Sequence, residues 1–281
     1  MLVEVIGGFI AHSLALIADA GHMLTDSASL MLALFALRMG KRPADQLYSY
    51  GRQRYEVLAA FVNGLVLLAL SLWIVIEAVQ RLLHPEPVQG WIMLVVAGLG
   101  LLANIAAFLV LRDGEDNLNM RSAVLHVLGD LLASAAAMVA AGVILLTRWM
   151  PVDPLLSILV SLLILRGGWR VIRESSHILL EGAPPGFDAA AVSADLVDQV
   201  PGVSGVHHLH AWSLTDSKPM MTLHAEITEG TDQDGTLAAI QLRLRERFGV
   251  AHATVQIERA PCGGKDDPCL DHGAAPKAHA H

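Results

Sequence analysis

The chain has 281 residues, of which 54% are hydrophobic and 16% charged, and its mean hydropathy is +0.51. A water-soluble protein of this composition would expose large apolar patches, so the composition excludes a soluble globular protein and indicates an integral membrane protein. The formal net charge of −8 excludes a nucleic-acid-binding protein of the usual kind, which presents a basic face.

Five stretches are long and apolar enough to cross a membrane as helices, which takes about 20 residues each. They cover residues 15–37, 57–83, 90–111, 122–147 and 155–180. A shorter apolar segment, MLVEVIGGFIAHS at residues 1–13, precedes them and is too short to span. We interpret it as the second half of a span whose first half is missing because the start codon is assigned too far downstream. A true half-helix is the alternative.

Basic residues predict how these helices are oriented. The link between the first two spans holds five of them, Arg38, Lys41, Arg42, Arg52 and Arg54. The turn at residues 84–90 holds none, and the link at residues 148–154 holds one. Since loops rich in Lys and Arg stay on the cytoplasmic side, the first link and the C-terminus are predicted to be cytoplasmic.

The first span carries ionisable side chains inside an apolar sequence, ALIADAGHMLTDSASLMLALFAL at residues 15–37. His22 and Asp26 are four residues apart, so on a helix they lie on one face. A second pair with the same spacing, His126 and Asp130, occurs in the fourth span. Because an ionised carboxylate in hydrocarbon is costly unless it is paired, we expect the two pairs to share a partner.

Two imidazole nitrogens and two carboxylate oxygens make a tetrahedral ligand set that suits a divalent cation, zinc foremost. For a single His–Asp pair, a hydrogen-bonded packing role is an equal alternative. Two copies, each followed by small residues that allow close helix contact, favour the metal site. Asp19 lies on the same stripe as His22; ligation, a place at the outer mouth and a hydrogen bond to the helix start all stay open. Asn63 and Asn104 are predicted to form hydrogen bonds between helices rather than to bind metal.

The ligand types distinguish a metal transporter from a metal enzyme. Only neutral imidazole and ionised carboxylate bind metal, so such a site releases its ion when it takes up protons, as a proton-driven exporter requires. A zinc enzyme would need a base beside an open zinc position, as in the motif H-E-x-x-H, and the sequence has no such motif. An intramembrane hydrolase is therefore disfavoured, and the protein is predicted not to be an enzyme.

The composition changes after the last span. Residues 181–281 hold 14 acidic and 7 basic residues, whereas the first 180 hold 13 and 12. APPG at residues 183–186 indicates a linker, and the following segments alternate as helix, strand, strand, helix and strand, with Asp188 as the first helix cap and Gly249 ending the second helix. This order predicts a small ferredoxin-like α+β domain. The predicted parts are a transmembrane domain, a cytosolic domain and a flexible Cys- and His-bearing tail, at residues 1–182, 183–260 and 261–281.

Three motifs, SLALIADAGHMLTDSASL, LHVLGDLLAS and GVHHLHAWSLT, resemble those of the cation diffusion facilitators, in their zinc-transporting branch of cobalt-zinc-cadmium resistance type efflux proteins. The resemblance covers nearly the whole chain. It implies a six-helix membrane bundle with its first helix truncated here, a ferredoxin-like cytosolic domain, and a homodimer in the bacterial inner membrane. It also implies proton-coupled export of Zn²⁺, and of Cd²⁺ or Co²⁺, by alternating access. By this resemblance the transport site maps onto His22, Asp26, His126 and Asp130.

The resemblance implies a second metal site, in the cytosolic domain. The regulatory zinc ligands of the family correspond to His207, His224 and Glu258 of this chain. His208 and His210 are neighbouring candidates, and ordinary exposed strand histidines are the alternative. Zinc is thus expected both as cargo and as a regulatory ligand that tightens the dimer by cancelling repulsion between the acidic domains.

Two further pairs of residues match features of relatives. Cys262 and Cys269 resemble C-terminal cysteine pairs of zinc-transporting members, with an inert tail as the alternative. Arg54 and Glu181 correspond to a charge pair that joins the helix bundle to the soluble domain, and two solvated charges are the default interpretation. Both pairs are expectations that follow from the resemblance.

Some relatives bind another metal ion in their first cytoplasmic loop, through an Asp and two His. This chain departs from them there. Asp45 is retained, but the other two positions are Tyr48 and Arg52, so we predict no metal site there. The sequence as a whole predicts a proton-coupled exporter of divalent metal. The alternative is a membrane zinc sensor or partner subunit that binds zinc without moving it.

Overall fold

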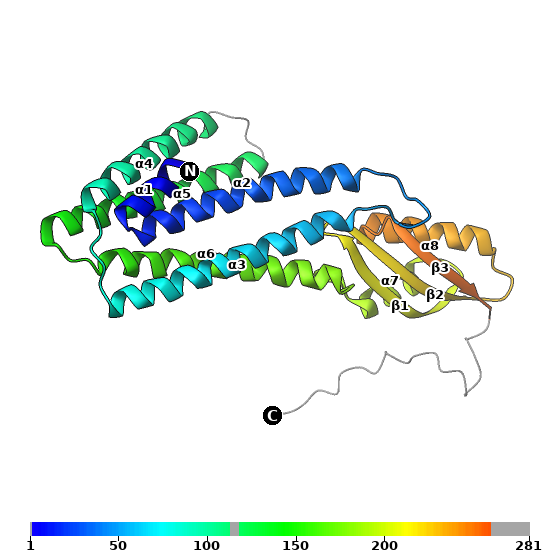
Figure 1. The fold of residues 1–281 in the computed structure, drawn as a ribbon. Helices are drawn as coiled ribbons and strands as arrows, with labels where there is room; N and C mark the ends of the chain where they lie inside the picture. Colours follow the sequence, from blue (N-terminus) through cyan, green and yellow to red (C-terminus); the bar gives the residue numbers. More distant parts are fainter. Residues whose placement is uncertain (1, 113–117, 260–281) are drawn as a thin grey trace, which may run out of the picture. The chain divides into compact units, whose positions relative to one another are not determined.

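The computed structural model describes residues 2–112 and 118–259, and the chain divides into two compact units, Met1–Leu179 and Leu180–His281 (Figure 1). The described residues of the first unit form helices and the turns and loops that join them. Its helices are α1 (Leu2–Ala11), α2 (Leu14–Gly40), α3 (Arg54–Leu83), α4 (Gly90–Arg112), α5 (Leu118–Thr147) and α6 (Val152–Leu179).

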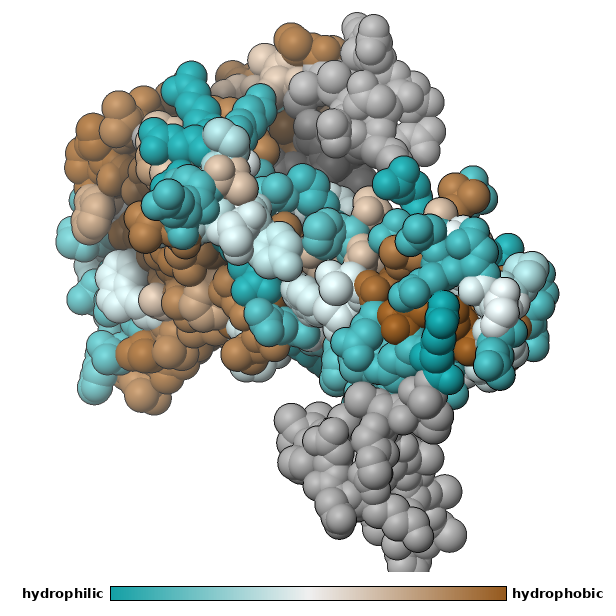
Figure 2. Space-filling model, turned by 90° about the vertical axis from the view of Figure 1, so that its right-hand side faces the viewer, coloured by the Kyte–Doolittle hydropathy of each residue, from teal (hydrophilic) through white to brown (hydrophobic). Residues whose placement is uncertain are grey.

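Five of these helices, α2 to α6, are long and apolar enough to cross a membrane, which confirms the predicted spans. The helix α1 is also apolar but has only 10 residues. Large hydrophobic side chains are exposed along the helices, and hydrophobic residues cover much of the visible surface of this unit in Figure 2. Such a surface is stable only in a hydrocarbon environment, so the chain is a multi-pass membrane protein.

Glycine allows close helix contact in the bundle, for example between α3 and α6. The helix α3 packs along α6, and α4 packs along α5. A Cβ atom added to Gly64 on α3 would lie 2.7 Å from Ile172 Cγ1 and 3.3 Å from the carbonyl oxygen of Gly168, both on α6. Small residues at such a crossing let two backbones approach and gain van der Waals contact, which drives helix association in membranes.

We expect the substitution Gly64→Leu to destabilise the bundle, because its side chain would enter space that Ile172 occupies. Overpacking of this kind costs about 1–3 kcal/mol. The matched control is Gly167→Leu on α6, where an added Cβ meets nothing within 4 Å and helix propensity rises equally. Thermal unfolding in detergent should show a lower midpoint for Gly64→Leu alone. Equal midpoints for the two variants would contradict the contact.

Side-chain hydrogen bonds join helices inside the bundle. Ser29 on α2 donates its hydroxyl to Oδ1 of Asn63 on α3. Asn104 on α4 donates from Nδ2 to Ser134 Oγ on α5 at 3.1 Å, and both of these side chains are buried. The prediction that Asn63 and Asn104 bond between helices is therefore confirmed.

The second unit has the predicted order of helix, strand, strand, helix and strand: α7 (Ala189–Gln199), β1 (Val203–Thr215), β2 (Lys218–Ile227), α8 (Gln233–Phe248) and β3 (His252–Glu258). The strands form one sheet in the order β1-β2-β3. The pair β1 and β2 is antiparallel, and the pair β2 and β3 is parallel, with α8 as the crossover between them. The chain therefore combines a membrane helix bundle with a small α+β domain, as predicted.

The two helices of this unit cover one face of the sheet. The core holds Val192 and Leu196 from α7, Ile240 and Leu244 from α8, and Met221, Leu223 and Ala225 from β2. Since side chains alternate along a strand, His224 and Glu226 lie on the opposite face, away from the helices. The predicted helix ends are confirmed: Asp188 caps α7 by accepting from two backbone amides, and Gly249 ends α8 in the left-handed conformation at φ 69°.

Candidate metal sites

The helix α2 holds the first His–Asp pair on one face. Nε2 of His22 lies 3.6 Å from Oδ2 of Asp26, as the spacing of four residues predicts. The two side chains are 27% and 32% exposed, so neither is sealed inside the bundle. An imidazole and a carboxylate at this separation offer a nitrogen and an oxygen to the same small volume.

The helix α5, which carries the second pair, contacts α2. Asp19, one turn before His22, is 6% exposed, is hydrogen-bonded to Ser134 of α5, and interacts electrostatically with Asp130. Two acidic groups from different spans are thus brought near each other in the bundle. The backbone of His126 is in α5, but its side chain lies outside the described residues, so the four-ligand site stays a prediction.

The start of α2 is fixed by a buried carboxylate that lies about 140 residues later in the sequence. Asp153, in the first turn of α6, accepts hydrogen bonds from Ser13 Oγ, from the amide of Leu14 at 2.9 Å and from the amide of Ala15 at 3.3 Å. Both Asp153 and Ser13 are 0% exposed. These bonds satisfy amides that a helix N-terminus leaves without intrahelical partners.

Asp153 was not among the predicted site residues. The signal that could have found it is a lone acid in the apolar segment VDPLLSILV, because an acid at membrane depth needs a partner. The neighbouring turn is held in addition by Arg81 of α3, whose Nη1 donates to the carbonyl oxygen of His12 at 2.6 Å. His12 itself has a left-handed backbone, with φ 54°. Groups from α3 and α6 therefore fix where α2 begins.

The loop between α2 and α3 is held by an ion pair, a cation–π contact and hydrogen bonds to Asp45. The guanidinium of Arg52 lies 2.7 Å from Oδ2 of Asp45 and 4.5 Å above the ring of Tyr48. Oδ1 of Asp45 also accepts from the amides of Leu47 and Tyr48, each at 2.9 Å. A hydrogen bond from the backbone of Tyr48 and the charge of Arg52 hold the pKa of Asp45 below its usual value. Asp45 and Tyr48 therefore both contact the guanidinium of Arg52.

The predicted cytosolic ligands lie together on the face of the sheet away from the helices. Oε2 of Glu258 lies 3.2 Å from Nε2 of His207, and its Oε1 lies 2.8 Å from Nδ1 of His224. Glu258 is 9% exposed, and burial alone would raise its pKa. The hydrogen bond from Gln256 and the nearby imidazoles outweigh burial and hold the pKa of Glu258 below its usual value.

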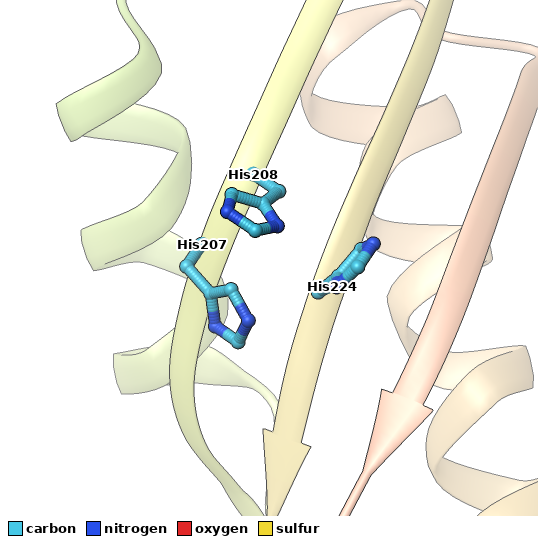
Figure 3. A group of neighbouring side chains, drawn as sticks. All are labelled: His207, His208 and His224. Atoms are coloured by element: carbon cyan, nitrogen blue, oxygen red, sulfur yellow. The ribbon is translucent and has the colours of Figure 1, made fainter. Parts of the chain in front are cut away.

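A third histidine joins this cluster. His207 and His208 project from β1 and His224 from the neighbouring strand (Figure 3). One ligand atom from each of the three imidazoles lies within 4.8 Å of the others. His210, by contrast, is exposed and pairs with Thr222 further along β1. Sequence alone did not separate His208 from His210, because regular alternation along a strand would place them on the same face.

The remaining predicted pairs are not tested by the geometry. Arg54 is the first residue of α3, and Glu181 follows α6 with a left-handed φ of 60°. The two residues belong to different units, and their ion pair stays a prediction. Cys262 and Cys269 lie outside the described residues.

Comparison with known proteins finds similarity along both units. The family described as cation efflux transmembrane domain matches residues 1–180, and the family described as cation efflux protein, cytoplasmic domain, matches residues 184–260. The zinc transporter ZitB of Escherichia coli is 48% identical over 284 residues, which covers 100% of this chain and 90% of that protein. A cadmium, cobalt and zinc/H(+)-K(+) antiporter of Bacillus velezensis is 36% identical over 100% of this chain and 91% of its own length.

The chain is also similar to solved structures. Among them is the metal-bound C-terminal domain of the CzcD transporter from Cupriavidus metallidurans, with 30% identity and a TM-score of 0.24, covering 26% of this chain and 99% of that domain.

Proposed function

Because the chain belongs to the cation efflux family, we propose that it exports zinc from the cytoplasm in exchange for protons, with cadmium and cobalt as further cargo. It is a metal-efflux transporter and not an enzyme. The observation that carries the proposal is the His22–Asp26 pair, with atoms 3.6 Å apart on a membrane helix that contacts the helix of Asp130. Relatives named as a zinc transporter and as a metal/H⁺ antiporter support the cargo and the coupling.

The proposed transport site consists of His22, Asp26, His126 and Asp130. Two carboxylates offset the charge of one divalent cation, which makes a dication tolerable at membrane depth. Two imidazoles and two carboxylates favour tetrahedral zinc over magnesium or calcium, which prefer more oxygen ligands. Asp19 would act as an accessory group that holds α2 against α5 through Ser134 rather than as a fifth ligand.

Proton coupling follows from the same ligands. In the proposed cycle an inward-facing state binds zinc with its imidazoles neutral and its carboxylates ionised. After the bundle turns outward, protons from outside occupy these groups, so the ion loses its ligands and leaves. The protonated site then returns inward and releases its protons to the cytoplasm. Metal and protons thereby move in opposite directions through one set of side chains.

We assign residues 1–182 to the transport domain, 183–260 to the cytosolic domain and 261–281 to a tail that includes Cys262 and Cys269. In this proposal the protein is a homodimer of the inner membrane with a cytoplasmic C-terminus. Zinc bound by the cytosolic domain would lower the repulsion between two acidic domains, since residues 181–281 hold 14 acidic and only 7 basic residues. Zinc then serves as regulatory ligand as well as cargo.

Flux into proteoliposomes tests the proposal. The purified protein is reconstituted around a zinc-sensitive dye, and Zn²⁺ is added outside with the lumen either acidic or at the outer pH. Proton coupling predicts fast uptake with an acidic lumen and a loss of this stimulation when a protonophore collapses the gradient. Zinc binding without uptake would instead identify a sensor, and uptake indifferent to the gradient would contradict coupling. Cd²⁺, Co²⁺ and Mg²⁺ in the same assay define the cargo range.

A further inference from the structure

The strand β1 is irregular at the histidine cluster. His207 pairs with His224 across the antiparallel ladder, but the next paired residue is His210, opposite Thr222, so the register shifts between them. His208 has φ 47°, in the left-handed region that residues other than glycine rarely adopt. Such strain persists only where the surrounding structure imposes it, and it gathers at ligand sites. The strand is therefore bent at His208 by a β-bulge.

The bulge changes where two consecutive side chains point. In a regular strand His207 and His208 would project to opposite faces of the sheet. A bulge turns one residue out of the alternation and re-aims its side chain. As a result the ring of His208 lies 5.0 Å from that of His207 and 4.9 Å from that of His224, between centroids (Figure 3).

We propose that His208 is a zinc ligand, which makes the cytosolic site a set of three imidazoles and one carboxylate: His207, His208, His224 and Glu258. The inference deepens the proposed function and rests on it, because it adds a fourth ligand to the regulatory site. All four donors come from one chain, so the site binds a tetrahedral ion without a ligand from a second subunit. Three nitrogens and one oxygen select zinc or cobalt over the hard cations magnesium and calcium.

The distances agree with a site that closes around an ion. Zinc–nitrogen bonds of about 2.0–2.1 Å in a tetrahedron put neighbouring ligand atoms about 3.3 Å apart. The three imidazole atoms lie within 4.8 Å of one another, and Glu258 already lies 2.8 Å from His224 and 3.2 Å from His207. The three imidazoles must therefore move closer together to bind one ion, while Glu258 is already within ligand spacing of two of them.

Outer partners orient two of the ligands. Nδ1 of His207 lies 3.3 Å from Oε1 of Glu226, which leaves its Nε2 facing the centre. Gln256 donates from Nε2 to Oε1 of Glu258 at 2.7 Å and fixes that carboxylate. Hydrogen bonds of this kind from outside the ligand set hold metal ligands in place in known metal sites.

Cobalt binding to the full chain tests the proposal. The background protein carries Asp26→Ala, Asp130→Ala, Cys262→Ser and Cys269→Ser, so that metal binding reports on the cytosolic cluster. Co²⁺ should give the intense visible absorption of a four-coordinate ion, and Zn²⁺ should displace it. His208→Asn should raise the Kd for Zn²⁺ by about 10–100-fold, a range that even outer partners of metal ligands produce. Its cobalt absorption should weaken, because water enters the coordination shell.

Asparagine is chosen because it tolerates the left-handed backbone, so the variant removes the imidazole and keeps the bulge. The matched control is His210→Ala, two residues away and exposed, which should change neither Kd nor spectrum. Equal binding by His208→Asn and His210→Ala, together with loss of binding in His224→Ala, would overturn the role of His208 alone. Unchanged binding in His207→Ala and His224→Ala as well would overturn the whole cytosolic site, and with it that part of the proposed function.

Discussion

The substitution Asp130→Ala is expected to reduce zinc flux by at least about 100-fold. It leaves the bound dication with only one carboxylate ligand, Asp26, so one of its two positive charges is no longer offset at membrane depth. Removing one member of a buried charge pair costs about 3–5 kcal/mol. Since 1.36 kcal/mol is a factor of ten, even the lower value weakens binding by about two orders of magnitude.

Proteoliposome uptake at fixed lumenal pH measures this effect, with protein content matched between samples. Asp26→Ala should fall as far as Asp130→Ala, because each removes one of the two carboxylates. The control is Glu77→Gln, which changes a carboxylate on α3 that pairs with Arg81 at 3.2 Å and is 31% exposed. Flux of Asp130→Ala within threefold of the control would contradict its place among the ligands.

Local periodicity explains why much of the architecture could be predicted. Runs of apolar residues determine which segments span a membrane, and a spacing of four residues places His22 beside Asp26 whatever the rest of the fold does. Asp188 and Gly249 form their capping hydrogen bonds with residues close by in the sequence. The start of α7 and the end of α8 could therefore be predicted as well. These features depend on short stretches of chain.

Contacts between segments far apart in the sequence could not be predicted in this way. Ser13 and Asp153 are 140 residues apart, and no period links them. The bulge at His208 breaks the alternation on which strand prediction depends, so the sequence pattern misassigns the direction of this side chain. Both features are decided by tertiary packing, and both concern polar groups with a defined partner. Buried acids and irregular strand positions are thus where sequence patterns predict least.

The second large effect is expected for Asp153→Ala. The lost carboxylate leaves Ser13 Oγ and the amides of Leu14 and Ala15 without their acceptor in a site from which water is excluded. A buried donor without a partner costs about 1–3 kcal/mol. Several such donors and the loss of a helix cap should lower the unfolding free energy by more than about 2 kcal/mol.

Flux should fall as well, because α2 carries His22 and Asp26 and its position depends on this cap. We expect a decrease of about tenfold or more, since a ligand displaced by about 1 Å no longer completes the site. The conservative variant Asp153→Asn should lie in between: its carbonyl oxygen still accepts a hydrogen bond, but its NH₂ group faces donors. Thermal unfolding in detergent and uptake in proteoliposomes measure the two effects separately.

The control for Asp153 is another helix cap with the same chemistry in a different environment. Asp188 accepts from the amides of Ala190 at 2.9 Å and Ala191 at 3.2 Å at the start of α7, and it is exposed. Water replaces a lost acceptor there, so Asp188→Ala should lower stability much less and leave zinc flux unchanged. If Asp153→Ala behaved like Asp188→Ala in both assays, burial of the Asp153 cap would have no bearing on transport, and the position of α2 would have to depend on its packing against the neighbouring helices and on the hydrogen bond from Arg81 to His12.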